Sequence, residues 1–432
     1  MIFAAADCER TPALRLAPLL KLRQAQAGER YRDELARPGF DYQPGDSKLT
    51  WLRRNGGAPG PVDPRKLPYY LLIVGDPQQI PFSFQDQLDL AHAVGRIHFD
   101  TLAEYASYAQ SVAAAEETTR PLTLPRQAAF FAAVNGADPA TQLSAGQLVA
   151  PLAQAFAARL QGWQVSHWEQ AAATKARLAA LLGGDSTPAF LFSAMHGLGL
   201  EPSGHLRQRT EQGALVCSDW RGQGAPEANH CLAAADIGDD ARLAGLIAFF
   251  FACYGAGTPQ CDDFTIATRQ ELEGVQLGGL ETLDPIRIAP APFVARLPQR
   301  LLGHPRGGAL AVVGHIDRAW GSAFLWEGVQ QSATFESALT RLFGGDRLGV
   351  VVEDFSDRDA ELSAEVAAAH LDAQSAPVRA ARRAGAAVDR QQRRPEHDHP
   401  GRPGGAAGSA GGRPGRPWLV AGRDRYDFVG GG

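Results

Sequence analysis

The sequence predicts an α/β protein built on a parallel-rich sheet that is flanked by helices and preceded by a smaller α/β subdomain. Two observations support this prediction. From Gln127 onward, short apolar runs alternate with segments of helical spacing, which is the rhythm of βαβ units. Two of these runs, Pro188–Gly197 and Leu246–Gly255, are almost wholly apolar and end in Gly, as strands buried on both faces do.

The larger unit is expected to span residues 126–355, and the spacing of its apolar residues predicts its elements in order. A last strand is predicted at Leu348–Val352, although Gly349 weakens its β character. The other elements are strands at Ala128–Val134, Trp163–Trp168, Ala189–Met195, within Leu246–Gly255 and at Ala309–Val313, helices at Thr141–Leu160 and Ala171–Leu182, and a polar loop at Leu198–Asn229.

The residues before the larger unit divide at about residue 64. Residues 1–64 are predicted to be irregular apart from a helix at Ala13–Ala27, because a Gly/Pro-rich loop runs through Gly56–Pro64. Residues 65–122 are predicted to form the smaller α/β subdomain, with a strand at Tyr69–Val74 and a helix at Thr101–Glu117.

The composition changes abruptly near the end of the chain. A helix is predicted over residues 356–373, after which residues 374–432 are rich in Arg, Gly, Ala and Pro. Such a segment buries little apolar surface, so it is predicted to be disordered. A shift of reading frame in a GC-rich gene would produce the same change, and the sequence leaves both interpretations open.

Charge and cysteine content narrow the class of protein. The 432 residues carry a net charge of −5, and the end from Ser375 holds eleven arginines against five acidic residues, so the body is more acidic still. No nucleic-acid partner is expected for such a chain. Five cysteines favour a reducing cytosol over a secreted disulfide framework. Because no apolar stretch reaches membrane-spanning length, and Asp7, Glu9 and Arg10 interrupt the N-terminal one, we expect a cytoplasmic protein without a signal peptide.

Each of the two apolar runs ends in a reactive side chain. His196 ends the first run and Cys253 ends the second, and glycines follow both. Parallel strands bring their carboxyl ends to one edge of the sheet, where open α/β sheets carry their sites. A base beside a thiol is an arrangement for nucleophilic catalysis. We therefore expect the two side chains to face each other, with the thiol pKa lowered by the imidazole.

This order of motifs resembles the caspase–gingipain class of cysteine peptidases, in which a strand ending in His-Gly precedes a strand ending in Ala-Cys. The resemblance is nearest to gingipain-type peptidases, because a series of short segments is similar to the subdomain that precedes their catalytic domain. These segments are Leu71–Asp76, Ile80-Pro81, Asp86-Gln87, Val94–Arg96 and Glu116-Glu117.

The resemblance implies a caspase-like catalytic domain and a cysteine endopeptidase that needs no metal and no other cofactor. Cys253 would be the nucleophile and His196 its partner, which takes the thiol proton or polarises the scissile amide and protonates the leaving amine. The backbone N–H groups of Gly197 and Cys253 would form the oxyanion hole.

A charged substrate side chain would meet a pocket residue of opposite sign in this class. Asp219, Trp220, Asp262 and Asp263 follow the two reactive residues in sequence and are the expected pocket residues. The three acids favour cleavage after basic residues, since a carboxylate pairs well with a guanidinium. They could equally be solvated charges or helix caps, in which case other side chains would build the pocket: Arg207, Arg209, Arg318 and Trp320.

Other catalytic motifs are missing from the sequence, and two alternatives to a peptidase stay open. The set His205, Cys217, His230 and Cys231 lacks the spacing of a common zinc site, and no serine-hydrolase elbow or Walker A sequence occurs. The first alternative is a non-catalytic caspase-like scaffold or binding module in a bacterial defence or signalling complex. The second is a cysteine-dependent hydrolase of small amides. The expected partners are a protein or peptide substrate and proteins of a defence system, with no membrane partner.

Overall fold

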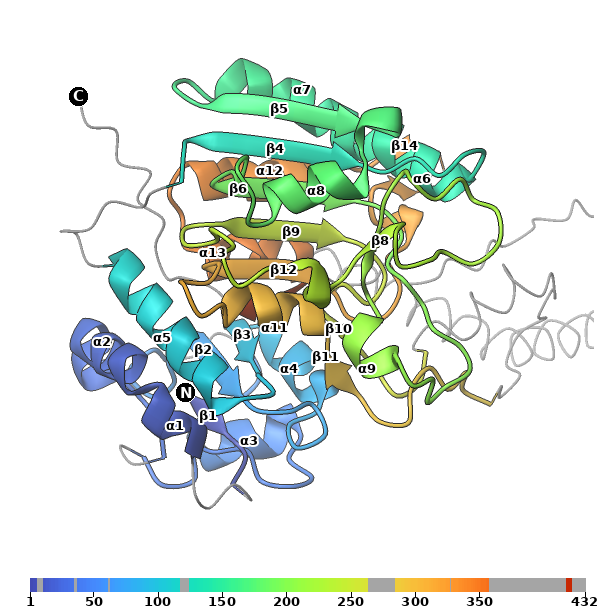
Figure 1. Cartoon of the computed structure of the whole chain (residues 1–432). Coiled ribbons are helices and arrows are strands. Elements are labelled where there is room, and N and C mark those ends of the chain that lie inside the picture. Colours follow the sequence, from blue (N-terminus) through green and yellow to red (C-terminus); the bar gives the residue numbers. More distant parts are fainter. Residues whose placement is uncertain are drawn as a thin grey trace, which may run out of the picture.

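The computed structural model describes residues 1–5, 11–34, 37–60, 63–116, 124–262, 284–326, 328–356 and 417–421. A six-stranded sheet lies at the centre of the larger unit, in the order β15-β12-β9-β6-β4-β5 (Figure 1). The five strands from β12 to β5 run parallel, whereas β15 pairs antiparallel with β12. The predicted α/β class with a parallel-rich sheet is therefore confirmed. The strands are β4 (Gln127–Ala132), β5 (Gln164–Glu169), β6 (Phe190–Ala194), β9 (Ile247–Phe251), β12 (Ala311–His315) and β15 (Pro417–Ala421).

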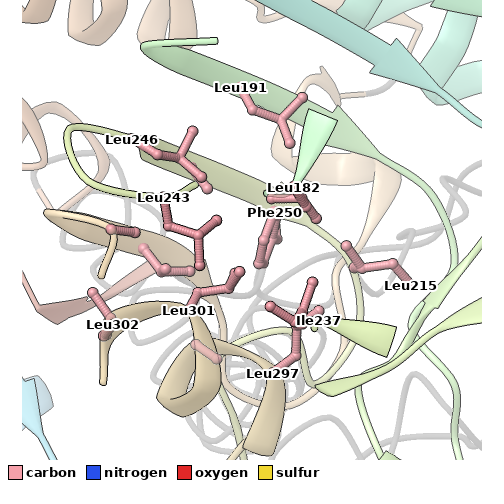
Figure 2. Close-up of a cluster of buried hydrophobic side chains, with 14 of the residues drawn as sticks. Leu182, Leu191, Leu215, Ile237, Leu243, Leu246, Phe250, Leu297, Leu301 and Leu302 are labelled. Atoms are coloured by element: carbon pink, nitrogen blue, oxygen red, sulfur yellow. The ribbon is translucent and has the colours of Figure 1, made fainter. Parts of the chain in front are cut away.

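The sheet is buried on both faces, which explains why its central strands are continuous apolar runs rather than alternating ones. In β9, Phe250 packs into the apolar cluster of one face, and its neighbours Phe249 and Phe251 pack into that of the other. Figure 2 shows the first face, where Phe250 lies between Leu191 of β6 and Leu301 of α11. Burying each such side chain stabilises the fold by about 1.5–3 kcal/mol.

Helices cover both faces of the sheet. The first face is covered by α5 (Leu102–Glu116), α8 (Lys175–Leu181) and α11 (Arg296–Leu302), and the second by α7 (Ala150–Arg159), α12 (Ala333–Phe343) and α13 (Leu348–Val351). The remaining elements of this unit are short. They are α6 (Pro139–Ser144), the π-helical turn η2 (Ala145–Val149), η3 (Gln170–Ala172), α9 (Gln208–Glu211), β7 (Leu215–Val216), β8 (Cys231–Leu232), η4 (Ala234–Asp236), β10 (Gly257–Thr258), β11 (Phe293–Val294), η5 (Gly321–Ala323), β13 (Leu325–Trp326) and β14 (Val329–Gln330).

The N-terminal residues form a second, three-stranded parallel sheet in the order β1-β2-β3. Its first strand comes from the segment predicted to be irregular, because Ile2 and Phe3 pair with Ile73 and Val74. The predicted helix of this segment is present as two pieces, and a further helix lies at Lys48–Arg54. The elements are β1 (Ile2–Phe3), α1 (Thr11–Arg15), α2 (Ala17–Ala27), η1 (Gly28–Arg30), α3 (Lys48–Arg54), β2 (Tyr70–Val74), α4 (Phe82–Asp89) and β3 (Ala93–Ile97).

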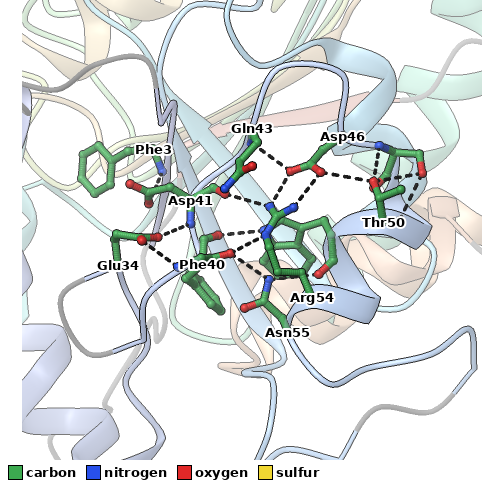
Figure 3. Close-up of polar contacts among 12 residues, drawn as sticks. Phe3, Glu34, Phe40, Asp41, Gln43, Asp46, Thr50, Arg54 and Asn55 are labelled. Atoms are coloured by element: carbon green, nitrogen blue, oxygen red, sulfur yellow. Dashed lines mark hydrogen bonds and ion pairs between the residues drawn. The ribbon is translucent and has the colours of Figure 1, made fainter.

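A polar network fixes the loop that precedes α3 (Figure 3). The Arg54 guanidinium pairs with the Asp46 carboxylate and donates to the Gly39 carbonyl at 2.7 Å. The Glu34 carboxylate accepts hydrogen bonds from the backbone N–H groups of Gly39 and Asp41, at 2.6 and 2.9 Å. The Gly and Pro residues of this loop predict an irregular segment but not its hydrogen bonds. The loop is ordered because its backbone groups have side-chain partners.

The predicted strand at Leu348–Val352 is wrong, because these residues form helix α13. Leu348, Val351 and Val352 are spaced by three and four positions, so a helix turns all three into the apolar cluster of the second face. Gly349 lies on the opposite side, where a Cβ would come within 2.5 Å of the Ala93 Cβ. The glycine therefore lets the helix pack closely on β3.

The prediction of disorder after residue 373 is contradicted at residues 417–421, which form strand β15 on the edge of the main sheet. The segment Pro417–Ala421 contains Trp and Val, which are good strand formers. The predicted helix over 356–373 and the rest of the Arg-rich end lie outside the described residues apart from Ser356.

Candidate active site

The two reactive residues lie at the same edge of the main sheet. Strands β6 and β9 are parallel neighbours with Ala194 opposite Phe251, and His196 and Cys253 each follow two residues later. The pairing continues past the strand ends, since the Met195 N–H donates to the Phe251 carbonyl at 3.1 Å. The prediction that both apolar runs are adjacent parallel strands is thereby confirmed.

Gly197 is required by the close approach of the Cys253 backbone. A Cβ at residue 197 would overlap the Cys253 carbonyl oxygen and lie 2.8 Å from the carbonyl carbon. A similar contact occurs at Gly213, where a Cβ would overlap the Tyr254 carbonyl. Both glycines therefore let the loop after β6 pack against the backbone at the reactive cysteine.

His196 is held by a carboxylate that sequence reasoning missed. The His196 Nε2 lies 2.8 Å from the Oδ2 of Asp138, which also caps helix α6 by accepting from the backbone N–H of Thr141 at 2.9 Å and from its hydroxyl at 2.7 Å. Because an ionised carboxylate only accepts, a neutral imidazole donates from Nε2 and leaves Nδ1 as its acceptor nitrogen.

The Asp138 carboxyl is tuned to stay ionised. Its partial burial alone would raise its pKa, but the hydrogen bonds from Thr141 and the interaction with His196 outweigh burial and lower the pKa below the ordinary value. The sequence carried one usable signal for this residue. Asp138 follows β4, the parallel neighbour of β6, so it lies at the same sheet edge as His196.

The Cys253 sulfur is partly buried and is contacted by the loop that follows β12. The backbone N–H of Ala319 donates to its Sγ at 3.3 Å. Burial raises the thiol pKa above its ordinary value, and it outweighs the opposing influence of the Ala319 and Gly197 amides and the Arg318 charge. The expectation of a lowered pKa is therefore wrong. The sequence around Cys253 does not reveal this burial, because the loop that contacts the sulfur follows β12 and lies 66 residues later in the chain.

The chain turns sharply directly after the reactive cysteine. Tyr254 has a φ of 58°, which is uncommon for a bulky residue, and Asp317 has a φ of 74°. The two strained residues are joined, because the Tyr254 N–H donates to the Asp317 carbonyl at 2.7 Å. Backbone strain of this kind is concentrated at functional sites, where the surrounding structure holds it in place.

Among the expected pocket residues, Trp220 lies beside the site, with its ring centroid 6.1 Å from that of His196. Asp219 is exposed and accepts a 2.6 Å hydrogen bond from the Lys175 N–H at the start of α8. The fully buried Asp262 carboxylate pairs with Arg318 at 3.1 Å. Two of the acids are thus engaged by the protein itself, and Asp263 lies outside the described residues.

The alternative pocket residues differ in their surroundings. Arg318 lies close enough to the thiol for its charge to oppose the rise of the Cys253 pKa. Arg207 pairs with Glu211 at 3.2 Å, and Arg209 lies over the Phe293 ring at 5.1 Å. Trp320 directly follows Ala319, whose N–H contacts the Cys253 sulfur. Arg318 therefore lies near the reactive cysteine and Trp320 follows the residue that contacts it, whereas Arg207 and Arg209 are engaged at α9.

The alternative zinc site finds no support among the described residues, where no group of three or more His, Cys, Asp or Glu side chains is arranged to hold a metal ion. Cys217 and Cys231 are both free thiols and pack into different apolar clusters. Within the same described residues, no helix combines the length and apolar character that crossing a membrane requires.

Comparisons with known proteins give distant similarities of fold. No family model matches the chain, and no curated protein matches it in sequence. The chain is similar to the structure of a protease, with 12% identity and a TM-score of 0.46, over 82% of this chain and 70% of that one. It is also similar to the complex of Porphyromonas gingivalis RgpB pro- and mature domains, with 11% identity and a TM-score of 0.35, over 63% of this chain and 54% of that one.

Proposed function

We propose that this protein is a cysteine endopeptidase that uses Cys253 and His196 to hydrolyse peptide bonds. The observation that carries the proposal is the matched position of the two residues after β6 and β9, with His196 bound to Asp138 at 2.8 Å. A nucleophile, a base and a group that orients the base are the parts that nucleophilic acyl transfer requires.

The proposed chemistry begins from a neutral thiol. The Cys253 sulfur attacks the scissile carbonyl carbon, and the thiol proton reaches the leaving amine through His196. The carbon–nitrogen bond breaks to give a thioester and a free amine. Water then hydrolyses the thioester, which releases the acid product and restores the thiol. Asp138 stabilises the imidazolium that forms in each half of the reaction.

Two backbone amides support an oxyanion hole in this proposal. Among the described residues, neither the Gly197 nor the Cys253 N–H donates a hydrogen bond to a backbone carbonyl. The Gly197 amide also acts on the Cys253 sulfur, where it opposes the rise of the thiol pKa. Amides at the nucleophile that donate to no backbone carbonyl are suited to a developing oxyanion, whose stabilisation by one such donor is worth about 3–4 kcal/mol.

The neutral thiol is compatible with this role. A raised pKa slows oxidation and alkylation of the sulfur in the absence of substrate. Substrate binding would place the scissile amide against His196 and the oxyanion donors, so that proton transfer and attack occur together. This order fits a peptidase whose imidazole acts on the substrate amide as well as on the thiol.

The substrate preference and cellular setting extend the proposal. Cleavage after basic residues would rely on Asp219 or Asp263, because Asp262 is already paired with Arg318. We also propose that the protein is cytoplasmic and takes part in bacterial defence or signalling. In defence and in signalling alike, its substrate would be a protein or peptide chain.

A peptide library tests the proposed function. The purified full chain should cleave internal peptide bonds, and Cys253→Ala and His196→Ala should each reduce the rate by about 10³-fold or more. Asp185→Ala offers a control variant, because this exposed residue precedes β6 and therefore lies at the opposite end of the strand from His196. Cleavage that persists in Cys253→Ala would rule out the assignment, and turnover of small amides without peptide cleavage would favour the amidase alternative.

A further inference from the structure

A contact joins the N-terminal unit to the loop that carries Cys253. Helix α4 of the small unit begins at Phe82, and Figure 1 shows α4 beside β10 and β11. A Cβ placed on Gly257 would lie 2.9 Å from the Cζ of the Phe82 ring. The ring therefore packs directly on the backbone of Gly257, which lies four residues after the reactive cysteine.

The Phe82 ring is itself held by a buried arginine. The Arg96 guanidinium lies 5.2 Å from the ring centroid, and the residue is only 2% exposed. It donates to the Gln85 side chain at 2.7 Å and to the carbonyls of Gly75 at 2.9 Å and Ile80 at 2.6 Å. A buried charge keeps this arrangement because losing any partner would leave a costly unpaired group. The start of α4 is therefore fixed in place.

The loop on the other side of this contact has little freedom. Gly257 and Thr258 pair with β11, and the Ala295 N–H donates to the Ala256 carbonyl at 3.0 Å. Helix α5, which follows β3 of the small sheet, also contacts this region, since its Glu104 pairs at 2.7 Å with Arg296, the first residue of α11. The N-terminal unit thus contacts the Cys253 loop directly through Phe82 and indirectly through the start of α11.

We propose that Phe82 is a positioning residue for the nucleophile loop, so that the N-terminal unit is part of the machinery that orients Cys253. The inference rests on the proposed function for its catalytic consequence. The effect of Phe82 on the position of the thiol does not depend on that function and can be tested without a substrate. Misplacement of a reacting atom by about 1 Å is enough to lower a rate by roughly 10²-fold.

The first test compares Phe82→Ala with Phe84→Ala in the full chain. Phe84 lies on the same helix and is equally apolar, but it packs on Tyr42 and Trp51 inside the small unit. Phe82→Ala should lower kcat by about tenfold or more with little change in KM, whereas Phe84→Ala should lower the melting temperature and leave kcat near wild type. Equal loss of kcat in both variants, or no loss in Phe82→Ala, would overturn the inference.

The second test approaches the same contact from the other side. Gly257→Ala puts a methyl group against the Phe82 ring and 3.0 Å from the Phe293 carbonyl oxygen, so it should lower kcat. In the Phe82→Ala, Gly257→Ala double variant the methyl group occupies part of the vacated space. The combined loss should therefore be smaller than the product of the single losses. Strictly multiplicative losses would contradict the proposed contact.

A third readout needs no substrate and separates this inference from the proposed function. Iodoacetamide modification of Cys253, followed by mass spectrometry of its peptide, reports the exposure of the thiol. Because burial raises the thiol pKa, a loosened loop should react faster in Phe82→Ala than in wild type or Phe84→Ala. If wild type cleaves no peptide but this difference is present, the proposed function fails and the positioning contact stands. Unchanged modification rates in Phe82→Ala overturn the inference in either case.

Discussion

The Cys253 carbonyl occupies the space that a side chain at Gly197 would need. The histidine loop and the cysteine loop are therefore packed backbone to backbone at Gly197 and Cys253. Two parallel strands alone would allow the loops beyond them to diverge. Because Gly197 has no side chain, the two loops can stay in contact beyond the ends of β6 and β9.

Gly197→Ala is expected to disrupt this packing. Its Cβ must displace the Cys253 backbone, so the free energy of unfolding should fall by about 1–3 kcal/mol and peptide cleavage should be lost. Gly199→Ala is the matched control, because its Cβ would meet only the Tyr254 ring at an ordinary 3.6 Å. Urea denaturation and the peptide assay check both variants. A Gly197→Ala protein with wild-type activity would show that the packing is not needed.

The pH dependence of Cys253 alkylation is the second prediction. The thiol pKa lies above its ordinary value of 9.0 because the sulfur is buried, so reaction with iodoacetamide should keep rising with pH through 9. Arg318→Gln should move this profile to still higher pH, since the Arg318 charge favours the thiolate. Rates measured from pH 6 to 10 by mass spectrometry provide the test. A plateau below pH 8 would contradict the buried, neutral thiol.

Asp138→Asn is expected to lower kcat by about 10²–10⁴-fold, because the amide cannot stabilise the imidazolium and favours the wrong tautomer. The pH dependence of kcat in the wild-type protein gives a second check on the Asp138 carboxylate. The carboxyl pKa lies below its ordinary value of 3.8, so the stabilising charge is present above that pH and is lost only as pH falls through the lowered pKa.

Thr141→Val is the companion variant for this carboxylate. It removes the 2.7 Å hydroxyl contact that helps to lower the Asp138 pKa, while the backbone N–H at residue 141 still donates. The acid limb of the rate profile should therefore move to higher pH, with kcat at neutral pH reduced much less than in Asp138→Asn. An acid limb that stays unchanged would mean that another group titrates there.

Sequence reasoning succeeded where the fold is set by local pattern. Strands β6 and β9 were recognised because burial on both faces makes them continuous apolar runs, and their glycine-flanked ends indicated His196 and Cys253. The same reasoning failed at Leu348–Val351, since a short apolar run fits a buried strand and a buried helical turn equally well.

The parts of the site that depend on distant contacts were not predictable. The position of Asp138 after β4 places it at the correct sheet edge, but its contact with His196, 58 residues away, is visible only once α6 is placed there. The thiol pKa is set by burial under the Arg318–Ala319 loop, which no local pattern at Cys253 reveals. Likewise, the pairing of Asp262 with Arg318 appears only in three dimensions.

The Asp262–Arg318 pair leads to a prediction about substrate charge. Asp262→Asn leaves the partly buried guanidinium without its partner and should lower the free energy of unfolding by about 1–3 kcal/mol. Cleavage after Arg and Lys should fall no more than cleavage after other residues. Asp239→Asn is the control, because its exposed carboxylate pairs with Arg300 outside the proposed pocket and its loss should change neither stability nor cleavage appreciably. A selective loss of basic cleavage in Asp262→Asn would instead make Asp262 a pocket residue.

Covalent trapping of Cys253 tests the central claim most directly. A panel of peptidyl acyloxymethyl ketones with basic, acidic and apolar recognition residues should label the wild-type full chain at Cys253, as read by mass spectrometry of the modified peptide. Labelling should be absent in Cys253→Ala and slower by about 10²-fold or more in His196→Ala, because the reaction uses the same oriented thiol as catalysis. Labelling at Cys217 or Cys261 instead, or equal rates in His196→Ala and wild type, would contradict a Cys253–His196 peptidase.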